Sequence, residues 1–472
     1  MKSDPRLPVR AGKLLRVRAV WMVPLVLGSV VIAVMTAVYI SAVADPVSHL
    51  RGLPVGLVNQ DQGATIGSQH LDVGAQIASG LQASPAVSDP LSLQPQTLSQ
   101  AEAAMDDDGL YATVVIPPGF TADLLTVSGI ARTSTGAHTV PTVEILTNLR
   151  AGTVSSQLAT AILQPALAAA SHQVGQRLVA SIPPASRTPA ATLYLTDPIK
   201  VTTTQYRPLP NNAALGLSAF YIALLTMMCG FLGGVIVNNV VDSALGYSTN
   251  EIGPRWRQRR PLPINRWQTQ LVKWPVVVVL TAVLTAIELL VAAGVGMDTP
   301  YPLLLWVYMW LCAASVGVGT IVLFAAAGTF GQLIALLLFV YAGLASAGGT
   351  VPIEALPGPL RGLSNVEPLR EILAGTRSIM YFGARADAGL AHGALAAGLG
   401  LLLWVILGAA IVTWYDRKRF YRLDPDVIEY VDAAIAQHQA RRAAPGRSGT
   451  APRGDRDDRD DQEEDGDEQS GG

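Results

Sequence analysis

Residues 303–347 read LLLWVYMWLCAASVGVGTIVLFAAAGTFGQLIALLLFVYAGLASA. The wider stretch from Thr299 to Ile353 contains no charged residue. An α-helix rises about 1.5 Å per residue, so about 20 apolar residues cross the hydrocarbon layer of a bilayer. The stretch therefore predicts two membrane-spanning helices, 303–327 and 330–347, joined by a tight turn at Gly328-Thr329.

Four further apolar runs of similar length flank this pair, at residues 20–44, 213–241, 274–296 and 390–415. Half of the 472 residues are apolar and 14% are charged, whereas about a quarter are charged in an ordinary soluble domain. The chain therefore predicts an all-α membrane bundle of six transmembrane helices. Ala42-Val43-Ala44 resembles a signal-peptidase site, but the apolar run before it exceeds the roughly 7 to 15 residues of a signal peptide, so we expect it to be retained.

The Lys and Arg residues set the expected orientation, because short basic loops stay in the cytoplasm. They gather in the arm 1–19, in the loop before residue 274 and in the juxtamembrane segment 416–440, whereas segment 45–210 holds more acidic than basic residues. We therefore expect a plasma-membrane protein with both termini in the cytoplasm and segment 45–210 outside. The charged tail 441–472 has almost no large apolar residue, so we expect it to remain unfolded.

Segment 45–210 alternates between strand-like and helix-like stretches and predicts an extracytoplasmic α/β domain with about four strands. Both cysteines, Cys229 and Cys312, lie outside it in apolar runs, so the domain cannot rely on disulfides. Thr97 and Gln100 fit a capping box at the start of a short helix. The expected strands are 53–58, 110–116, 142–147 and an extended stretch 192–204, and the other expected helices are 66–81, one from Phe120, and 152–181.

No enzyme motif is recognisable in the chain. It lacks a GxxxxGK[ST] phosphate loop, an HExxH pair and a CxxC pair, and its histidines are scattered. Asp106-Asp107-Asp108 are consecutive, whereas an EF-hand needs acids at alternate positions, so the triplet favours a solvated turn. We expect no catalytic residue, cofactor, metal or nucleic-acid partner.

Two motifs and the layout resemble the YhgE/Pip branch of the ABC-2 membrane superfamily, which is similar to the nitrosoguanidine-resistance membrane proteins. The motifs are LPVGLVNQDQG at residues 53–63 and GLYATVVIPPGF at residues 109–120, and the layout is one span, an outer domain and five closing spans. This chain lacks the long coiled-coil outer domain of many YhgE/Pip proteins. The resemblance implies a permease that forms a homodimer or heterodimer and couples to a separate cytoplasmic ATPase.

In the resembled superfamily the loop between spans two and three carries a coupling helix that contacts the ATPase. The matching loop here, 248–273, is rich in tryptophan and arginine. The resemblance thus implies an ATPase-coupling role, and anchoring at the membrane interface is an equally good interpretation. The candidate residues are Trp256, Arg257, Arg260, Arg266 and Trp267.

Glu288 is the only Asp, Glu, Lys or Arg inside the predicted spans. A carboxylate at bilayer depth costs about 2.5 to 3.5 kcal/mol on insertion scales, so a functional role is the default and a carboxylate bonded to a neighbouring helix is the alternative. Outside the membrane, segment 351–388 predicts a short amphipathic helix that lids the outer mouth, with an ordinary surface loop as the weaker alternative. Its candidate residues are Pro357, Arg370, Glu371 and Arg377.

Gly230, Gly233, Gly234, Gly317 and Gly319 predict close helix packing and a dimer face. Two functions fit the whole sequence. The first is an exporter of an amphiphilic, lipid-like or drug-like compound, and the second is a non-transporting scaffold or receptor for envelope assembly or secretion. A membrane-bound enzyme is disfavoured, because the residues show no catalytic constellation.

Overall fold

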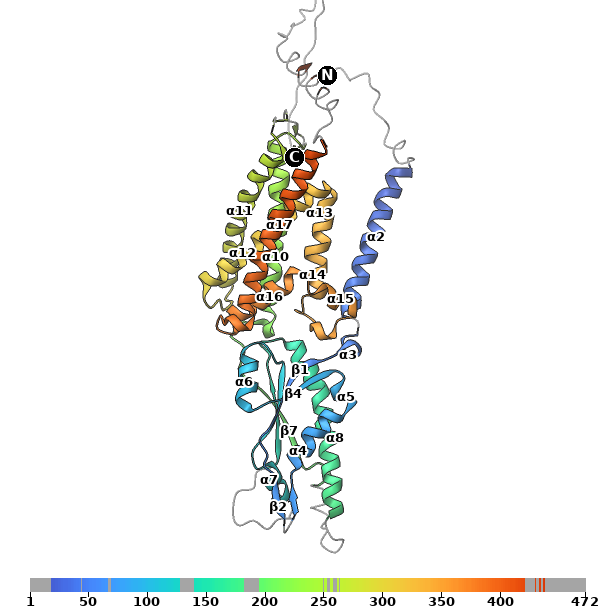
Figure 1. The fold of residues 1–472 in the computed structure, drawn as a ribbon, viewed down its shortest axis with the longest axis vertical. Helices are drawn as coiled ribbons and strands as arrows, with labels where there is room; N and C mark the ends of the chain where they lie inside the picture. The colour runs from blue at the N-terminus through green and yellow to red at the C-terminus, as the bar shows by residue number, and fades with distance from the viewer. Residues whose placement is uncertain are drawn as a thin grey trace, which may run out of the picture.

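The computed structural model describes residues 18–420 except 44, 67–68, 128–139, 182–194, 249, 253–254, 258–260 and 263, together with 429, 433, 436 and 437. A bundle of helices and a sheet domain follow one another along the long axis of the molecule (Figure 1). We call the bundle end beside the sheet domain proximal and the opposite end distal. Most of the predicted basic arm and the whole tail 441–472 lie outside the described residues.

Five helices among the described residues are long and apolar enough to cross a membrane, so the protein is membrane-embedded. The predicted fifth span, 330–347, is a shorter apolar helix, Phe330–Ser346, which contains a π-helical segment. The six-span count therefore stays a prediction. The five helices are α2 (Arg18–Val43), α10 (Ser218–Ala244), α11 (Arg266–Gly294), α12 (Pro302–Ala327) and the joined pair η5 (Ala386–Leu390) and α17 (Ala391–Arg417); the shorter one is α13 (Phe330–Ala335), η3 (Leu336–Tyr341) and α14 (Ala342–Ser346).

Helix α12 is the centre of the bundle and packs against α10, α11 and α17. In its most apolar stretch, 72% of the residues are buried. Glycines permit the close approach of α10 and α12. A Cβ atom on Gly230 would lie 2.5 Å from the carbonyl oxygen of Ala313, and one on Gly234 would lie 2.8 Å from that of Gly317. The predicted glycine packing is thus confirmed within one chain.

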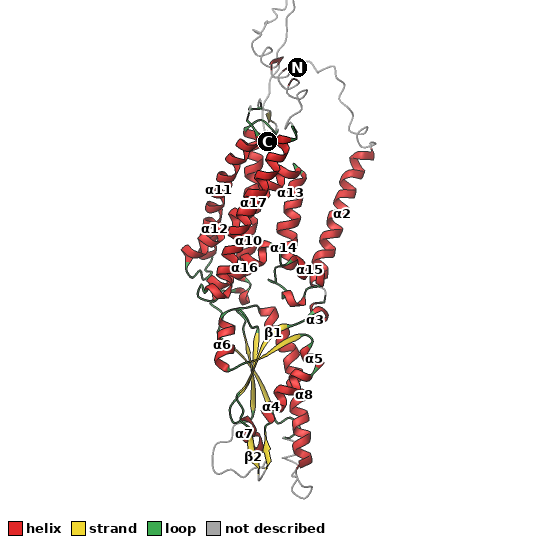
Figure 2. Ribbon diagram, viewed as in Figure 1, coloured by secondary structure: helices red, strands yellow, loops and turns green. Residues whose placement is uncertain are grey.

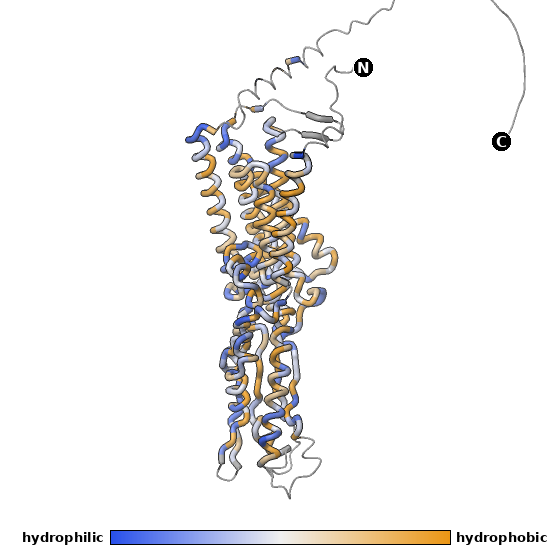
Figure 3. The backbone as a smooth tube through the Cα atoms, turned by 90° about the vertical axis from the view of Figure 1, so that its right-hand side faces the viewer, coloured by the Kyte–Doolittle hydropathy of each residue, from blue (hydrophilic) through white to orange (hydrophobic). Residues whose placement is uncertain are grey.

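Helix α2 stands apart from the other long helices and meets the bundle at α14 and η3 (Figures 1 and 2). Only 6% of the residues in its apolar stretch, Leu25–Ala42, are buried. The surface of α2 is strongly hydrophobic and exposes, among others, Trp21, Leu25 and Ile32. The other long helices of the bundle are similarly hydrophobic (Figure 3). Lipid is the solvent that such a surface requires.

The sheet has five strands in the order β4-β1-β5-β6-β7. All neighbours are parallel except β5 and β6, which are antiparallel. Helices cover it from both faces (Figure 2). The strands are β1 (Leu53–Asn59), β4 (Leu91–Pro95), β5 (Ala112–Ile116), β6 (Thr142–Thr147) and β7 (Lys200–Gln205), and the helices are α3 (Pro46–His49), α4 (Val73–Ala83), α5 (Pro85–Ser88), α6 (Leu98–Asp106), α7 (Phe120–Val127) and α8 (Thr153–Ser181).

The central strands are apolar on both faces, as expected for a sheet covered on both sides. Leu57 and Val114 face the large core beneath α4 and α8, whereas Val58 and Val115 face the smaller core beneath α6. The predicted capping box at the start of α6 is confirmed, because the Thr97 and Gln100 side chains each accept the other's backbone N–H. The sheet domain is therefore α/β, as predicted.

Two local predictions for this domain were partly wrong, and one strand was missed. The predicted extended stretch 192–204 becomes strand only at Lys200, where β7 begins, and residues 192–194 lie outside the described residues. The range 66–81 begins as a hairpin, β2 (Ala64–Ile66) and β3 (Gln69–Leu71), and becomes helix only after Asp72, whose carboxylate accepts the Ala75 N–H at 2.7 Å. Strand β4 was missed. It is a short edge strand that ends at Pro95, and proline is tolerated there because an edge strand leaves N–H groups unpaired.

Asp61 explains the turn in the first sequence motif. It is buried, and its carboxylate accepts the backbone N–H groups of Thr121 and Gly74, each at 3.1 Å, and the hydroxyl of Thr121. Because Gly74 belongs to α4 and Thr121 to α7, one side chain joins the end of β1 to the starts of two helices. A buried carboxylate satisfied by several N–H donors is a structural anchor.

Candidate functional site

The predicted coupling loop is split between two elements. Trp256 and Arg257 belong to β9 (Arg255–Arg257), which pairs with β8 (Asn250–Ile252) in an antiparallel hairpin. Arg266 and Trp267 open α11, and the Trp267 ring meets that of Trp274 edge-on at 6.1 Å. Arg260 lies outside the described residues. In the described part of residues 245–265 the backbone contains strands and turns but no helix, unlike the coupling helix that the resemblance implies.

A cavity of about 870 Å³ lies at the distal end of the bundle. The C-terminal ends of α10, α12 and α17 and the starts of α11 and α13 line it, so residues far apart in sequence meet there. Its lining mixes charged and amide groups with aromatic and aliphatic ones. The lining includes Asn238, Asp242, Arg266, Gln270, Lys273, Phe324, Ala325, Gln332, Val412, Trp414 and Tyr415.

Lys273 is the centre of the polar side of the cavity and was missed as a bundle residue. Its side chain is buried, and its Nζ lies 2.7 Å from Asp242 Oδ1 and 2.7 Å from Asn238 Oδ1. Helix α11 begins at Arg266, not at the predicted residue 274, so Lys273 is not a loop charge. The sequence contains a signal for this pair: Asp242 directly follows the predicted span 213–241, and Lys273 directly precedes the predicted span 274–296.

Arg266 and Gln270 extend the polar side towards the helix ends. Arg266 Nη2 donates to the carbonyl oxygen of Phe420 at 2.9 Å, and its guanidinium lies over the Tyr415 ring at 5.1 Å. Gln270 is 5% exposed, and its Oε1 is buried without a hydrogen-bond partner among the described residues. The cavity thus contains a buried acceptor that the described protein atoms leave unsatisfied.

Glu288 lies on α11 and faces α10. Its Oε1 accepts the Thr226 hydroxyl at 3.4 Å, and its Oε2 accepts the Cys229 thiol at 3.5 Å. The residue is half-buried and does not line the distal cavity. The carboxylate therefore faces a neighbouring helix, and its functional role stays a prediction.

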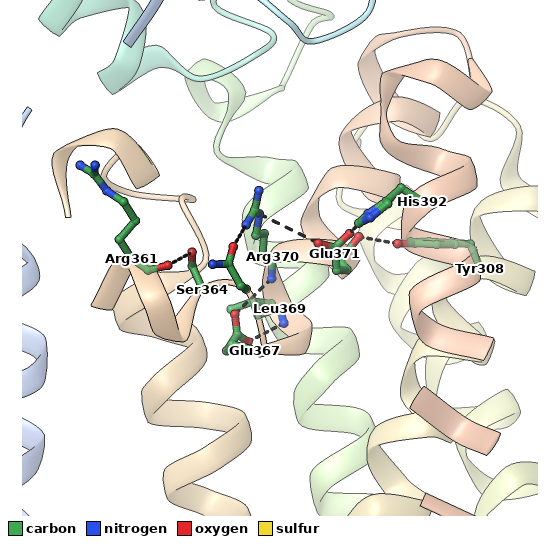
Figure 4. A network of polar contacts seen from close by, with 9 residues as sticks. Tyr308, Arg361, Ser364, Glu367, Leu369, Arg370, Glu371 and His392 are labelled. Carbon is green, nitrogen blue, oxygen red and sulfur yellow. Dashed lines mark hydrogen bonds and ion pairs between the residues drawn. The ribbon is translucent and has the colours of Figure 1, made fainter. Parts of the chain in front are cut away.

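The predicted outer helix exists as α16 (Pro368–Tyr381), which packs against α10, α12 and α17 near the proximal end. In Figure 4, Glu371 lies between two partners: its Oε2 is 2.5 Å from His392 Nδ1, and its backbone oxygen accepts the Tyr308 hydroxyl at 2.7 Å. Arg370 donates to Asn365 at 2.9 Å. These contacts fix α16 to α12 and α17.

The remaining predicted residues of this outer segment have different positions. Pro357 precedes α15 (Gly358–Leu363), and its carbonyl oxygen accepts the Arg361 N–H at 3.0 Å. Arg377 is only 9% exposed and its Nη2 lies 3.5 Å from the carbonyl oxygen of Gly348. The contacts of the four predicted lid residues are therefore distributed along the segment, with Arg370 and Glu371 paired at 4.0 Å, and their role as a lid stays a prediction. Two further short elements are η2 (Ala214–Gly216) and η4 (Ile353–Ala355).

The acidic triplet ends helix α6 at Asp106, and Asp107 and Asp108 form the turn after it; all three residues are half-buried instead of fully solvated. Arg207 lies 2.7 Å from Asp106, and Asp108 has a buried Oδ1. Burial raises the pKa of Asp108 to about 7, with Arg377 opposing and Glu354 reinforcing the shift. Burial also raises the pKa of Glu354. The triplet thus joins the sheet domain to the outer segment, which consecutive acids in a sequence do not reveal.

Among the described residues no group of three His, Cys, Asp or Glu side chains is placed to hold a metal ion. The distal cavity combines a buried ion pair, an unsatisfied amide and an apolar wall, a combination that binds molecules with a polar and an apolar part.

The family model described as "Protein of unknown function (DUF3533)" matches residues 23–406. No curated protein and no solved structure matches the chain. The matched range runs from α2 into α17 and includes the sheet domain. The chain therefore belongs to the DUF3533 family of proteins of unknown function.

Proposed function

We propose that this chain is an ABC-2-type membrane permease that exports an amphiphilic, lipid-like or drug-like compound. The distal cavity carries the proposal. Its volume of about 870 Å³ falls within the roughly 300–1,000 Å³ typical of small-molecule sites. Phe324, Val412 and Trp414 offer an apolar surface beside the Asp242–Lys273 pair, which suits a compound with a polar head and an apolar body.

The proposed assembly is a homodimer or heterodimer in the plasma membrane with both termini in the cytoplasm. This orientation places the distal cavity on the cytoplasmic side and the sheet domain outside. A separate ATPase subunit would contact the loop 248–273, whose arginines and tryptophans adjoin the cavity through Arg266. Binding at the cytoplasmic end is the arrangement that export requires.

The test uses cavity filling in purified protein reconstituted into vesicles, with and without a candidate ATPase subunit. Ala325 lines the cavity, whereas Ala327, two residues further along α12, does not. We expect Ala325→Trp to block movement of a fluorescent amphiphile and Ala327→Trp to leave it unchanged. Equal transport by both variants, or no transport by the wild type with any ATPase or amphiphile tested, contradicts the proposal.

A scaffold or receptor is the second candidate function, and the junction between the two parts favours it. Arg150 Nη1 donates to the carbonyl oxygen of Tyr381 at 3.0 Å, and the Arg51 N–H donates to that of Glu354 at 3.0 Å. A sheet domain held this firmly suits the display of a binding surface. Co-purification with envelope proteins, together with a vesicle assay that shows no transport, would favour this function.

A further inference from the structure

The segment that joins strand β7 to helix α10 has a strained backbone. Asn212, Ala214, Leu215 and Gly216 have positive φ angles of 59°, 47°, 57° and 87°. This left-handed region suits glycine and is tolerated by asparagine. An alanine or a leucine is strained there, because its Cβ atom approaches the following carbonyl oxygen. Ala214 and Leu215 are therefore two consecutive strained residues directly before a long helix of the bundle.

The local sequence of this segment favours a different conformation. Alanine and leucine are strong helix formers, and asparagine is a preferred N-cap residue. The sequence thus favours a helix that begins at residue 213, directly after Asn212. In the structure α10 begins only at Ser218, and its N-cap residue Leu217 makes no side-chain capping bond. A conflict of this kind between local propensity and structure is expected at strained or functional positions.

Hydrogen bonds from two other parts of the chain hold the strained segment. Asn212 Nδ2 donates to the carbonyl oxygen of Gly296, in the loop after α11, at 2.8 Å. The Thr153 hydroxyl, at the start of α8, donates to the carbonyl oxygen of Leu215. The Leu215 side chain is 70% exposed, so burial of that side chain does little to offset the strain. The conformation of the segment therefore depends on contacts with the sheet domain and with the loop after α11.

Helix α10 connects this segment to the distal cavity. It packs against α11, α12 and α16, and its opposite end contributes Asn238 and Asp242 to the cavity lining. A change of conformation at the start of α10 is therefore transmitted to a helix that touches both the sheet domain and the cavity.

We propose that residues 212–217 form a two-state switch that couples the sheet domain to helix α10. The first state is the strained segment held by Thr153 and Gly296. In the second state these two hydrogen bonds are broken, and residues 213–217 add a right-handed turn to α10 with Asn212 as the N-cap. Relief of the strain offsets the loss of the two bonds. The inference goes beyond the export function and does not depend on it.

The test measures the distance between β7 and α10 in the full chain. Spin labels are attached to cysteines that replace Gln205, at the end of β7, and Leu225, on α10; both residues are exposed. The native Cys229 and Cys312 are first replaced by alanine. Double electron–electron resonance in lipid nanodiscs gives the distance distribution, and we expect one main distance that belongs to the strained state.

Two substitutions favour opposite states of the switch. Leu215→Gly should keep the main distance, because glycine adopts the left-handed region without strain. Ala214→Pro should replace it by a distance that differs by about 5 Å, the rise of one helical turn. Proline cannot adopt a positive φ, whereas the first turn of a helix tolerates it.

Leu217→Gly is the matched control, because Leu217 has a right-handed φ of −81°, and it should leave the main distance in place. If Ala214→Pro fails to fold, Thr153→Val removes the hydroxyl that holds the segment and should make the second distance appear. A folded Ala214→Pro or Thr153→Val variant with an unchanged distance distribution overturns the inference. A shifted main distance in Leu215→Gly overturns it as well.

Discussion

The Arg385 guanidinium lies 2.8 Å from a carboxylate oxygen of Asp107 and 3.9 Å from one of Asp106. This pair joins the loop after α16 to the acidic turn of the sheet domain. Both side chains of the closer pair are partly exposed, at 45% and 34%, and exposed ion pairs contribute only about 0 to 1 kcal/mol. The dependence of this junction on pH is therefore expected to come from Asp108 and its neighbour Arg377, which are more deeply buried than the exposed pair.

The junction should be sensitive to pH through Asp108. Folding raises the pKa of Asp108 from 3.8 to about 7, because burial penalises the charged carboxylate. The folded state therefore holds the proton more tightly than the unfolded state. The stabilising contribution is fully present below about pH 3.8 and is lost as the pH rises through about 7. We expect a higher melting temperature of the purified protein at pH 5 than at pH 8.

The Asp108→Asn variant should reduce this difference, since asparagine stays neutral at both pH values. Part of the difference should remain, because the pKa of Glu354 is also raised by burial. Asp89→Asn is the control, since Asp89 is exposed on the sheet domain. A pH difference that survives intact in Asp108→Asn, or that vanishes equally in the control, contradicts this account.

The sequence predicts the elements of the fold well where a long or continuous run of apolar residues marks a helix or a strand. Uncharged runs located the long helices, and apolar strands such as Ala112–Ile116 located the central sheet. The prediction from sequence was wrong where contacts between distant residues determine the local structure. Strands β2 and β3 pair inside a stretch that resembles a helix in sequence. The Phe330–Ser346 helix, by contrast, matches the predicted range 330–347 to within one residue, and its crossing of the membrane stays a prediction.

The candidate sites show the same limit. Lys273 sits directly before an apolar run and resembles a topogenic loop charge, yet its partners Asp242 and Asn238 come from a different helix. The Asp106–Asp108 turn is paired by Arg207 and Arg385, which are distant in sequence. Such ion pairs depend on how the helices and loops pack together, so they cannot be predicted from the local sequence.

Removal of the Lys273 charge should strongly destabilise the bundle. Lys273→Met removes the ammonium group that lies 2.7 Å from the Asp242 carboxylate, whose side chain is only 17% exposed. Breaking a buried ion pair in this way costs about 3 to 5 kcal/mol. Unfolding by denaturing detergent, followed by circular dichroism, measures the loss.

The double variant Lys273→Met/Asp242→Asn removes both charges of the ion pair and should recover most of that stability, because the Asp242 charge is removed together with the Lys273 charge that stabilises it. Lys418→Met, at the exposed C-cap of α17, is the control and should have little effect. Equal stability of the single variant and the wild type would show that the pair contributes nothing.

Neutralising Glu288 should separate structure from function. Glu288→Gln keeps an oxygen that accepts from Thr226 or Cys229, so we expect normal expression and unfolding. If the carboxylate takes part in transport, export of the amphiphile in vesicles falls and its dependence on pH disappears. Glu371→Gln, in the outer network, is the control for a general effect of losing a carboxylate. Intact export with an intact pH profile in Glu288→Gln assigns the residue to helix packing.

Topology is the prediction on which the side of the cavity depends. The native cysteines lie in helices, with Cys312 buried and Cys229 half-buried, so both are first replaced by alanine. Ala86 is exposed on the sheet domain. We expect Ala86→Cys to react with a membrane-impermeant maleimide in intact cells and Arg259→Cys to react only after the cells are opened. This follows because the loop basic residues favour the cytoplasm whereas segment 45–210 has an excess of acids. The reverse pattern would place the distal cavity outside, where it would face the destination of an exported compound instead of its source.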